Sequence, residues 1–391
     1  MRTAGTQAIG IRTPIISRGD NLPEIIVDSL LDYCKESGAS ICDRDIIGVT
    51  EAVVARAQNN YATAGQIAAA VREKFPSGPV GLVFPILSRN RFAILLKGIA
   101  AGVDQLYVQL SYPCDEVGNH IISPQRLYES GVNPYTDVFT EAQFRARFGD
   151  IKHEFTNIDY LELYRSLGGN IEIILANDPC EMLKYTKQVI AGDVHTRSLT
   201  RSRLEKAGAQ IVCDLTDFLN TPASDCGYNE KYGLLGSNKA GEDSIKLFPH
   251  SCDDFVQNVQ ALTLERTGAK AEVLIYGDGA FKDPVGKIWE LADPVVSPAF
   301  TQGLCGLPNE LKLKYIADNE FADKRGEAAR DAIIKRIESK GDLMGKDETG
   351  GTTPRRISDL VGSLCDLVSG SGDKGTPVVL IKGYFDNYAD K

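Results

Sequence analysis

The chain is poor in histidine, and it lacks both paired-cysteine motifs and long apolar runs. Its four histidines are not spaced as metal-binding pairs, which argues against a structural zinc site. The nine cysteines are scattered without a CxxC pair and are odd in number, which favours reduced thiols over a disulfide framework. We therefore expect any metal in this protein to be a hard cation on oxygen ligands.

Other absences concern partners and location. No apolar segment approaches the roughly 20 residues of a membrane span, and the first residues lack the apolar core of a signal peptide. We therefore expect a cytoplasmic protein that does not bind membranes. The formal net charge is −10 and no tract is rich in Lys and Arg, so nucleic acid is a poor candidate partner. Anionic small molecules remain candidates, because a bound cation can reverse the local charge.

The middle of the chain, from about residue 78, alternates apolar runs with helical patterns. VGLVFPI, QLYVQLSYP, NIEIILA and AQIVCDL are predicted strands, and NRFAILLKGIAAG, PCEMLKYTKQVI and RSLTRSRLEKAG are predicted helices. Such alternation predicts a parallel sheet covered by helices. Residues 123–160 interrupt it, and they are weakly periodic, so we expect irregular structure there.

The flanking segments have a different pattern. The opening IGIRTPIISRGDNLPEIIVDSLLDYCKE predicts a strand, a loop and a helix, and IIGV at residues 46–49 predicts another strand. The segment 51–58 after it fits either a strand or a helix. Towards the other end, residues 253–267 and 319–339 predict helices. The final ISDLVGSLCDLVSGSGDKGTPVVLIKG predicts a helix, a glycine-rich loop and a strand.

The most informative stretch is AEVLIYGDGAFKDPVGK, residues 271–287. Its apolar run predicts a buried strand, which ends at a Gly-Asp-Gly sequence. The two glycines permit unusual backbone angles and let a ligand approach closely. Asp278, followed by Lys282 and Asp283, places two carboxylates and an ammonium at a strand end, a set that suits a metal ion and a phosphate. Asp-Gly is also a common hairpin pair, so a hairpin turn is the alternative.

Other glycine-rich or polar loops are weaker candidates. GSGDKGT deviates from the phosphate-loop pattern, because its lysine precedes the second glycine and the loop follows a helix. Its N–H groups can form an anion-binding nest, and a plain flexible connection is the alternative. Asp115, Glu116 and Asn119 follow a predicted strand, where α/β sheets bind ligands, although a polar turn is the preferred explanation. His195 has no evident Ser or Cys partner, and no GxSxG elbow is present.

Three blocks, taken together and in order, resemble the coenzyme F420:L-glutamate ligase family, γ-glutamyl ligases that use GTP. They are TPIISRGDNLPEII with DIIGVTEAVVARAQ, then GSNKAGEDSIKLFP with ERTGAKAEVLIYGDG, and finally ISDLVGSLCDLVSGSGDKGTPVVLIKG. The resemblance covers residues 1–75 and 226–391. It therefore implies an α/β fold in which a γ-glutamyl-ligase-like core of mixed sheets holds an inserted parallel-sheet α/β domain at residues 76–225.

The resemblance also implies roles for individual residues. It assigns Asp278 to a divalent metal and Arg56 to the phosphates. Together with the residues at the strand end, this gives Asp283 or Asp373 as helpers at the metal and Asp278, Lys282 and Arg56 as the catalytic set. The residues that it places at the nucleotide are Thr13, Pro14, Ile15, Ile16, Glu51, Arg56, Asn238, Ser369, Gly370, Ser371, Gly372, Asp373, Lys374, Gly375 and Thr376.

Two positions depart from the family pattern. Leu235 and Ser371 stand where the family has acidic residues, so the number of metal ions is open. Glu230 or Glu242 is the candidate substitute for the first acid, and Asp373 for the second.

These assignments predict a ligase that forms a γ-glutamyl amide between L-glutamate and a carboxylate acceptor, either F420-like or folate-like. GTP or ATP would activate the acceptor as an acyl phosphate, with Mg²⁺ or Mn²⁺ neutralising the phosphates. The resemblance suggests a homodimer. Two alternatives are a Rossmann-like nucleotide or dinucleotide enzyme centred on residues 76–225, and a catalytically inactive nucleotide-binding homologue.

Overall fold

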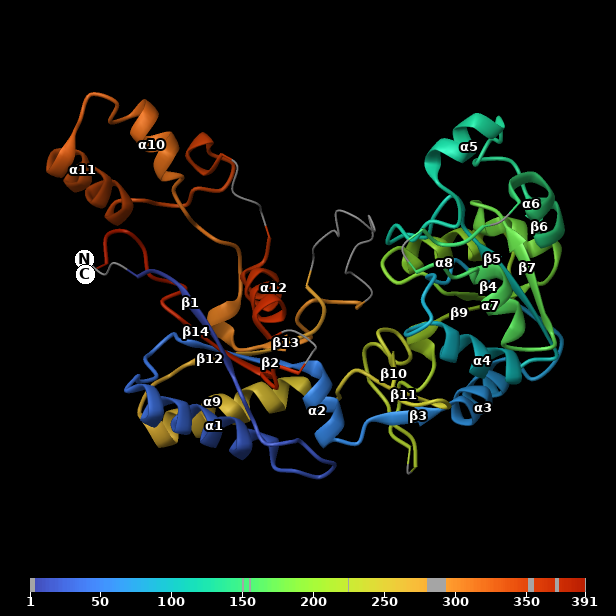
Figure 1. The fold of residues 1–391 in the computed structure, drawn as a ribbon, viewed down its shortest axis with the longest axis horizontal. Helices are drawn as coiled ribbons and strands as arrows, with labels where there is room; N and C mark the ends of the chain where they lie inside the picture. Colours follow the sequence, from blue (N-terminus) through green and yellow to red (C-terminus); the bar gives the residue numbers. More distant parts are fainter. Residues whose placement is uncertain are drawn as a thin grey trace.

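The computed structural model describes residues 4–149, 151–154, 156–223, 225–279, 293–350, 355–369 and 373–390. Within them, three sheets are interleaved with helices, so the expected α/β fold is confirmed. Figure 1 shows a five-stranded and a six-stranded sheet at opposite ends, with a small three-stranded sheet between them. None of the described helices is both long enough and apolar enough to cross a membrane.

The five-stranded sheet is built from both ends of the chain. Its order is β1 (Gln7–Ile11), β14 (Val378–Lys382), β2 (Ile46–Thr50), β12 (Glu272–Tyr276) and β13 (Ala299–Phe300). β2 and β12 are parallel, whereas β14 runs antiparallel to both of its neighbours, β1 and β2. Helices α1 (Leu22–Ser37) and α9 (Cys252–Thr267) cover one face, and α12 (Ile357–Ser369) covers the other (Figure 1).

Alternate residues of the central strand β2 supply the two faces of this sheet. Ile47 and Val49 pack with α1 and α9, while Ile46 packs on the α12 side. Gly48 also faces α12, where a Cβ atom would lie 2.3 Å from Cys365 Sγ. The missing side chain therefore lets α12 lie directly against the sheet.

The six-stranded sheet is parallel except at one edge. Its order is β6 (Phe139–Thr140), β7 (Ile171–Leu175), β5 (Gln105–Leu110), β4 (Pro79–Val83), β8 (Gln188–Ala191) and β9 (Ile211–Asp214), with β6 antiparallel. Helices α3 (Ala64–Lys74), α4 (Ala93–Ala101) and α7 (Tyr160–Ser166) share one apolar cluster with it. The short η1 (Pro179–Lys184) and α8 (Arg197–Lys206) share a second.

Two expectations for this region are wrong. The predicted helix PCEMLKYTKQVI divides into η1 and strand β8, because the β-branched Val189 and Ile190 are buried in the sheet between β4 and β9. Residues 123–160 are not simply irregular. They contain α5 (Pro124–Ser130), β6 and α6 (Glu141–Phe148), and Thr140 caps α6 through a reciprocal capping box with Gln143.

The remaining elements join or extend the two larger sheets. The small sheet consists of β10 (Asn238–Lys239), β11 (Ser244–Lys246) and β3 (Tyr61–Thr63). The segment after β2 forms helix α2 (Glu51–Ala57). The helix expected at 319–339 is α11 (Gly326–Glu338), which begins later than expected, where Gly326 has a φ of 55°. A separate helix, α10 (Leu313–Asn319), precedes it. Short 3₁₀ turns are η2 (Leu215–Asp217), η3 (Gln302–Leu304) and η4 (Asp347–Thr349).

Candidate active site

Strand pairing brings distant segments to one edge of the five-stranded sheet. Parallel strands β2 and β12 pair with Thr50 opposite Tyr276, so the segments after them leave at the same edge. β14 runs the other way and begins there, and Ile11 at the end of β1 pairs with Val378. Residues 13–16 therefore reach the same edge. The carboxyl ends of parallel strands are where α/β sheets bind ligands.

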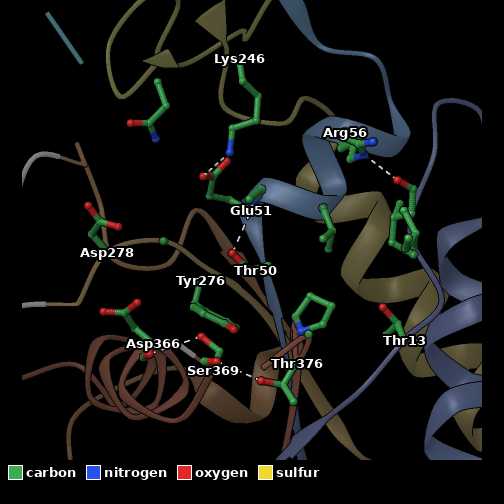
Figure 2. A pocket seen from close by; sticks show the side chains of 18 of the residues that line it. Thr13, Thr50, Glu51, Arg56, Lys246, Tyr276, Asp278, Asp366, Ser369 and Thr376 are labelled. Carbon is green, nitrogen blue, oxygen red and sulfur yellow. Dashed lines mark hydrogen bonds and ion pairs between the residues drawn. The ribbon is translucent and has the colours of Figure 1, made fainter. Parts of the chain in front are cut away.

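A cavity of about 510 Å³ lies at this edge (Figure 2). The residues that were predicted to contact the nucleotide or metal and that line it are Thr13, Pro14, Ile15, Ile16, Glu51, Arg56, Asn238, Asp278, Ser369, Gly375 and Thr376. All three blocks of the family resemblance thus contribute to one cavity. The chemical role of each residue stays a prediction.

The other predicted residues lie elsewhere or outside the described residues. Lys374 is exposed and lines a neighbouring cavity of about 650 Å³, which shares Thr13, Pro14 and Thr376 with the first. Asp373 is exposed and lines neither cavity. The candidates outside the described residues are Lys282, Asp283, Gly370, Ser371 and Gly372.

The position of Leu235 offers no metal ligand. Its side chain is fully buried in the apolar core, together with Leu234 and Leu247. Neither proposed substitute, Glu230 or Glu242, lines the 510 Å³ cavity. Any cation in this cavity would therefore depend on carboxylates other than these.

Glu51 begins helix α2 on the wall of the cavity and is 5% exposed. Its Oε1 accepts from Lys246 Nζ at 2.7 Å, and Figure 2 shows the two side chains meeting above Thr50. Within the described part of the chain, Glu51 Oε2 is buried without a hydrogen-bond partner. Burial raises the pKa of the Glu51 carboxyl, although the Lys246 ammonium opposes the rise. This unsatisfied oxygen suits a cation or a proton.

The Gly277–Asp278–Gly279 loop after β12 is held by two carboxylates. Asp278 N–H donates to Asp293 Oδ2 at 2.7 Å, and Gly279 N–H donates to Asp366 Oδ2 at 2.9 Å. The close approach that the glycines were expected to allow is thus made by the protein's own carboxylates. The loop is not a two-residue hairpin turn, since the antiparallel partner β13 begins only at Ala299.

Gly277 gives a direct test of this packing. A Cβ atom at Gly277 would lie 2.4 Å from Asp293 Oδ2, so we expect Gly277→Ala to lower the free energy of unfolding by about 1–3 kcal/mol. Urea unfolding measures the change. Gly169→Ala is the matched control, because a Cβ there meets no atom within 4 Å. Equal effects of the two substitutions would contradict the packing of Asp293 against Gly277.

Arg91 reaches this loop from the region of the six-stranded sheet, where it lies between β4 and α4. Its Nη1 donates to Asp293 Oδ1 at 2.6 Å, and its Nη2 forms an ion pair with Asp278. Burial disfavours its charge, but Asp293 and Asp278 together raise the pKa of Arg91 above its usual value. Burial also raises the pKa of Asp366, and the charge of Asp293 adds to that rise. Arg91 is thus a counter-ion of a carboxylate cluster in which Asp293 is buried and Asp278 and Asp366 are half-buried.

The donors at the cavity fit a divalent cation only in part. Among the described residues, no group of three or more His, Cys, Asp or Glu side chains is arranged to hold a metal ion. Two cavity carboxylates, Asp278 and Glu51, nevertheless supply oxygen donors, and Glu51 Oε2 has no hydrogen-bond partner among the residues that the structure describes. Mg²⁺ in phosphate sites is usually held by one or two carboxylates together with substrate phosphates and water. The donor chemistry therefore fits a cation that binds with a nucleotide.

Several residues of the site were not found from the sequence. Lys246 and Asp366 line the cavity. In the sequence, Lys246 is only a polar residue beside a short apolar run, and Asp366 is only a polar residue within an apolar helical pattern. Arg91 and Asp278 are 187 positions apart, so no local pattern connects them. Asp293 likewise acts through contacts distant in sequence.

The alternative site near Asp115 is a polar turn. The Asp115 carboxylate is buried and accepts from the N–H groups of Leu87, Val117 and Asn119, and from Asn119 Nδ2. Burial raises its pKa, which these hydrogen bonds oppose. Asp115 therefore connects the loop after β4 to the loop after β5.

Sequence comparison agrees with the geometry of the cavity. No curated protein matches the chain. The family described as F420-0:Gamma-glutamyl ligase matches residues 10–383. This span includes residues 76–225, so the expected limits of the resemblance, 1–75 and 226–391, were too narrow. The chain therefore belongs to the F420-0:gamma-glutamyl ligase family and is an acid–amino-acid ligase.

Proposed function

We propose that this protein uses GTP or ATP, with Mg²⁺ or Mn²⁺, to join L-glutamate to a carboxylate acceptor through an acyl phosphate. Family membership implies glutamate ligation to F420-0 and dependence on a nucleotide. One observation supports the finer proposal. A single cavity gathers residues 13–16, Glu51, Arg56, Asp278 and Thr376, which come from segments far apart in the sequence.

We assign the nucleotide to the side of the cavity formed by residues 13–16 and Thr376. Arg56 Nε donates to Ile16 O at 2.5 Å, which ties the 13–16 segment to helix α2 (Figure 2). The rest of its guanidinium would face the phosphates, since Arg56 is exposed and lines the cavity. Thr376 Oγ1 donates to Ser369 O at 2.9 Å and so fixes the end of the glycine-rich loop on α12.

In the proposed reaction, an acceptor carboxylate oxygen attacks the γ-phosphorus, and the nucleoside diphosphate leaves. The amine of L-glutamate then attacks the acyl carbon, and phosphate leaves with the former carboxylate oxygen. A divalent cation, when bound, would neutralise the phosphate charge and lower the barrier to the first attack. Asp278 and Glu51 are the residues that we assign to hold it, while Arg56 supplies a further positive charge.

The acceptor and the assembly form part of the same proposal. F420-0 is the acceptor that the family implies, and a folate-like carboxylate is the alternative. We propose residues 76–225 as an inserted domain of the ligase core, because every strand of the six-stranded sheet lies within 79–214. Its Arg91 pairs with Asp278, which lines the cavity. A homodimer stays a prediction, for which light scattering of the purified chain is the measurement.

A nucleotide-hydrolysis screen tests this function. We expect phosphate release from GTP or ATP only when L-glutamate, Mg²⁺ or Mn²⁺ and a carboxylate acceptor are all present. Mass spectrometry should then find the acceptor heavier by one glutamyl residue. Tight nucleotide binding without product for any acceptor would contradict the proposal and favour a catalytically inactive homologue.

A further inference from the structure

Among the described residues, three carboxylates and one guanidinium meet at the Gly277–Asp278–Gly279 loop. Asp278 belongs to this loop, Asp293 and Asp366 accept from its N–H groups, and the guanidinium of Arg91 pairs with Asp278 and Asp293. The side chain of Asp293 is 2% exposed and that of Arg91 is 15% exposed. Water therefore screens this pair poorly, and its charges interact strongly.

The side chain of Asp278 is the part of this group that reaches the cavity. It is 32% exposed and lines the cavity wall, whereas Arg91 does not line it. Arg91 thus pairs with Asp278 without itself lining the cavity. Glu51 also lines the cavity, and its buried Oε2 has no hydrogen-bond partner within the described part of the chain. A cation bound at Asp278 and Glu51 would be repelled by Arg91 and would compete with it for the Asp278 carboxylate.

We propose that Arg91 is a positioning residue of the ligase site, a tethered counter-ion that competes with the divalent cation for Asp278. This inference rests on the proposed function, because it takes Asp278 as a carboxylate that receives the cation. While Arg91 holds Asp278, cation binding in the absence of nucleotide is weak. Nucleotide phosphates bring negative charge into the cavity, and the cation then binds together with them. The region 76–225 thereby sets when the ligase site is loaded.

The position of Arg91 in the fold supports this role. Its loop follows β4. In the parallel sheet β4 lies between β5 and β8, so the chain adds later strands on both sides of β4. The loop is fixed on both sides: Leu87 N–H donates to the Asp115 carboxylate at 2.8 Å, and Asn90 O accepts from Lys239 N–H at 2.7 Å. A movement of the six-stranded sheet would therefore move the guanidinium relative to Asp278.

Manganese binding to the full chain without nucleotide tests the proposal. Electron paramagnetic resonance measures free Mn²⁺, and therefore its Kd, for the wild type and for Arg91→Gln, with no turnover required. Removing the guanidinium should tighten Mn²⁺ binding by about ten-fold or more. Arg91→Lys keeps the charge but loses the fork that spans both carboxylates, so we expect an intermediate gain. Should Arg91→Gln fail to fold, Arg91→Lys provides the test.

Two controls identify the cause of any change. Arg145→Gln removes another arginine of the same region that bridges two carboxylates, Glu141 and Asp159, and it should leave the Mn²⁺ affinity unchanged. The double substitution Arg91→Gln with Asp278→Asn should lose the gain. Unchanged or weaker Mn²⁺ binding by Arg91→Gln would overturn the proposal, even if the enzyme ligates glutamate. If Arg91→Gln binds Mn²⁺ more tightly but the wild type forms no glutamyl product, the proposal for Arg91 is supported and the proposed function is contradicted.

Discussion

Asp278→Asn is expected to reduce nucleotide-driven glutamate ligation by about 10²–10³-fold, the usual loss when one preorganised electrostatic group is removed from a catalytic site. Asp278 stands at the end of β12 and lines the cavity with the predicted nucleotide residues. An amide keeps the size of the side chain but removes the charge that would attract a cation. Initial rates with saturating nucleotide, glutamate and acceptor measure the loss.

A surface carboxylate provides the control for Asp278→Asn. Asp28 is exposed on α1, where it pairs with Arg266, and it lies outside the cavity. Asp28→Asn should retain the wild-type rate. Full metal-dependent turnover by Asp278→Asn would contradict the assignment of Asp278 to the cation.

Lys246→Met is expected to have the largest effect on stability, lowering the free energy of unfolding by about 3 kcal/mol. The side chains of Lys246 and Glu51 are 14% and 7% exposed, so removal of the ammonium leaves a buried carboxylate without its partner. Chemical denaturation at mildly alkaline pH measures the loss. The pair of the exposed Lys184 and the half-buried Glu181 is the control, because Lys184→Met removes a solvent-exposed ammonium and should change stability little.

The pH dependence of this loss has a definite sign. The folded pKa of Glu51 is raised above its ordinary value of 4.5 by burial, with Lys246 opposing the rise. Removing Lys246 raises it further, so the folded protein takes up a proton at a higher pH than the unfolded chain does. The destabilisation by Lys246→Met should therefore be largest above the raised pKa and should shrink as the pH falls towards 4.5. A loss that is independent of pH would contradict the buried pair.

Local patterns predicted much of the fold and part of the site. The apolar runs of β2, β12 and β14 are strands buried on both faces, which explains why they were recognisable without context. Asp278 was found because a glycine pair follows such a strand. The helix prediction for residues 179–190 was wrong because apolar residues in a short run fit either a helix or a strand. Only the pairing of this segment with β4 and β9 decides between the two.

The remaining site residues could not be predicted because their function arises from tertiary contacts. Lys246 becomes informative only beside the buried Glu51, from which it is separated by 195 positions. Arg91 lies outside the three sequence blocks that carried the resemblance, yet it pairs with Asp278. Asp366 looks in the sequence like an ordinary polar residue of a helix. Its role at the site is evident only from the hydrogen bond that Gly279 N–H donates to it.

The central claim is that the cavity activates an acceptor carboxylate as an acyl phosphate for attack by L-glutamate. Transfer of an oxygen isotope tests it most directly, with an acceptor carrying ¹⁸O in its carboxylate, unlabelled nucleotide, Mn²⁺ and L-glutamate. We predict that the released phosphate contains one acceptor-derived ¹⁸O for each glutamyl product formed. Product formation with unlabelled phosphate would contradict the account.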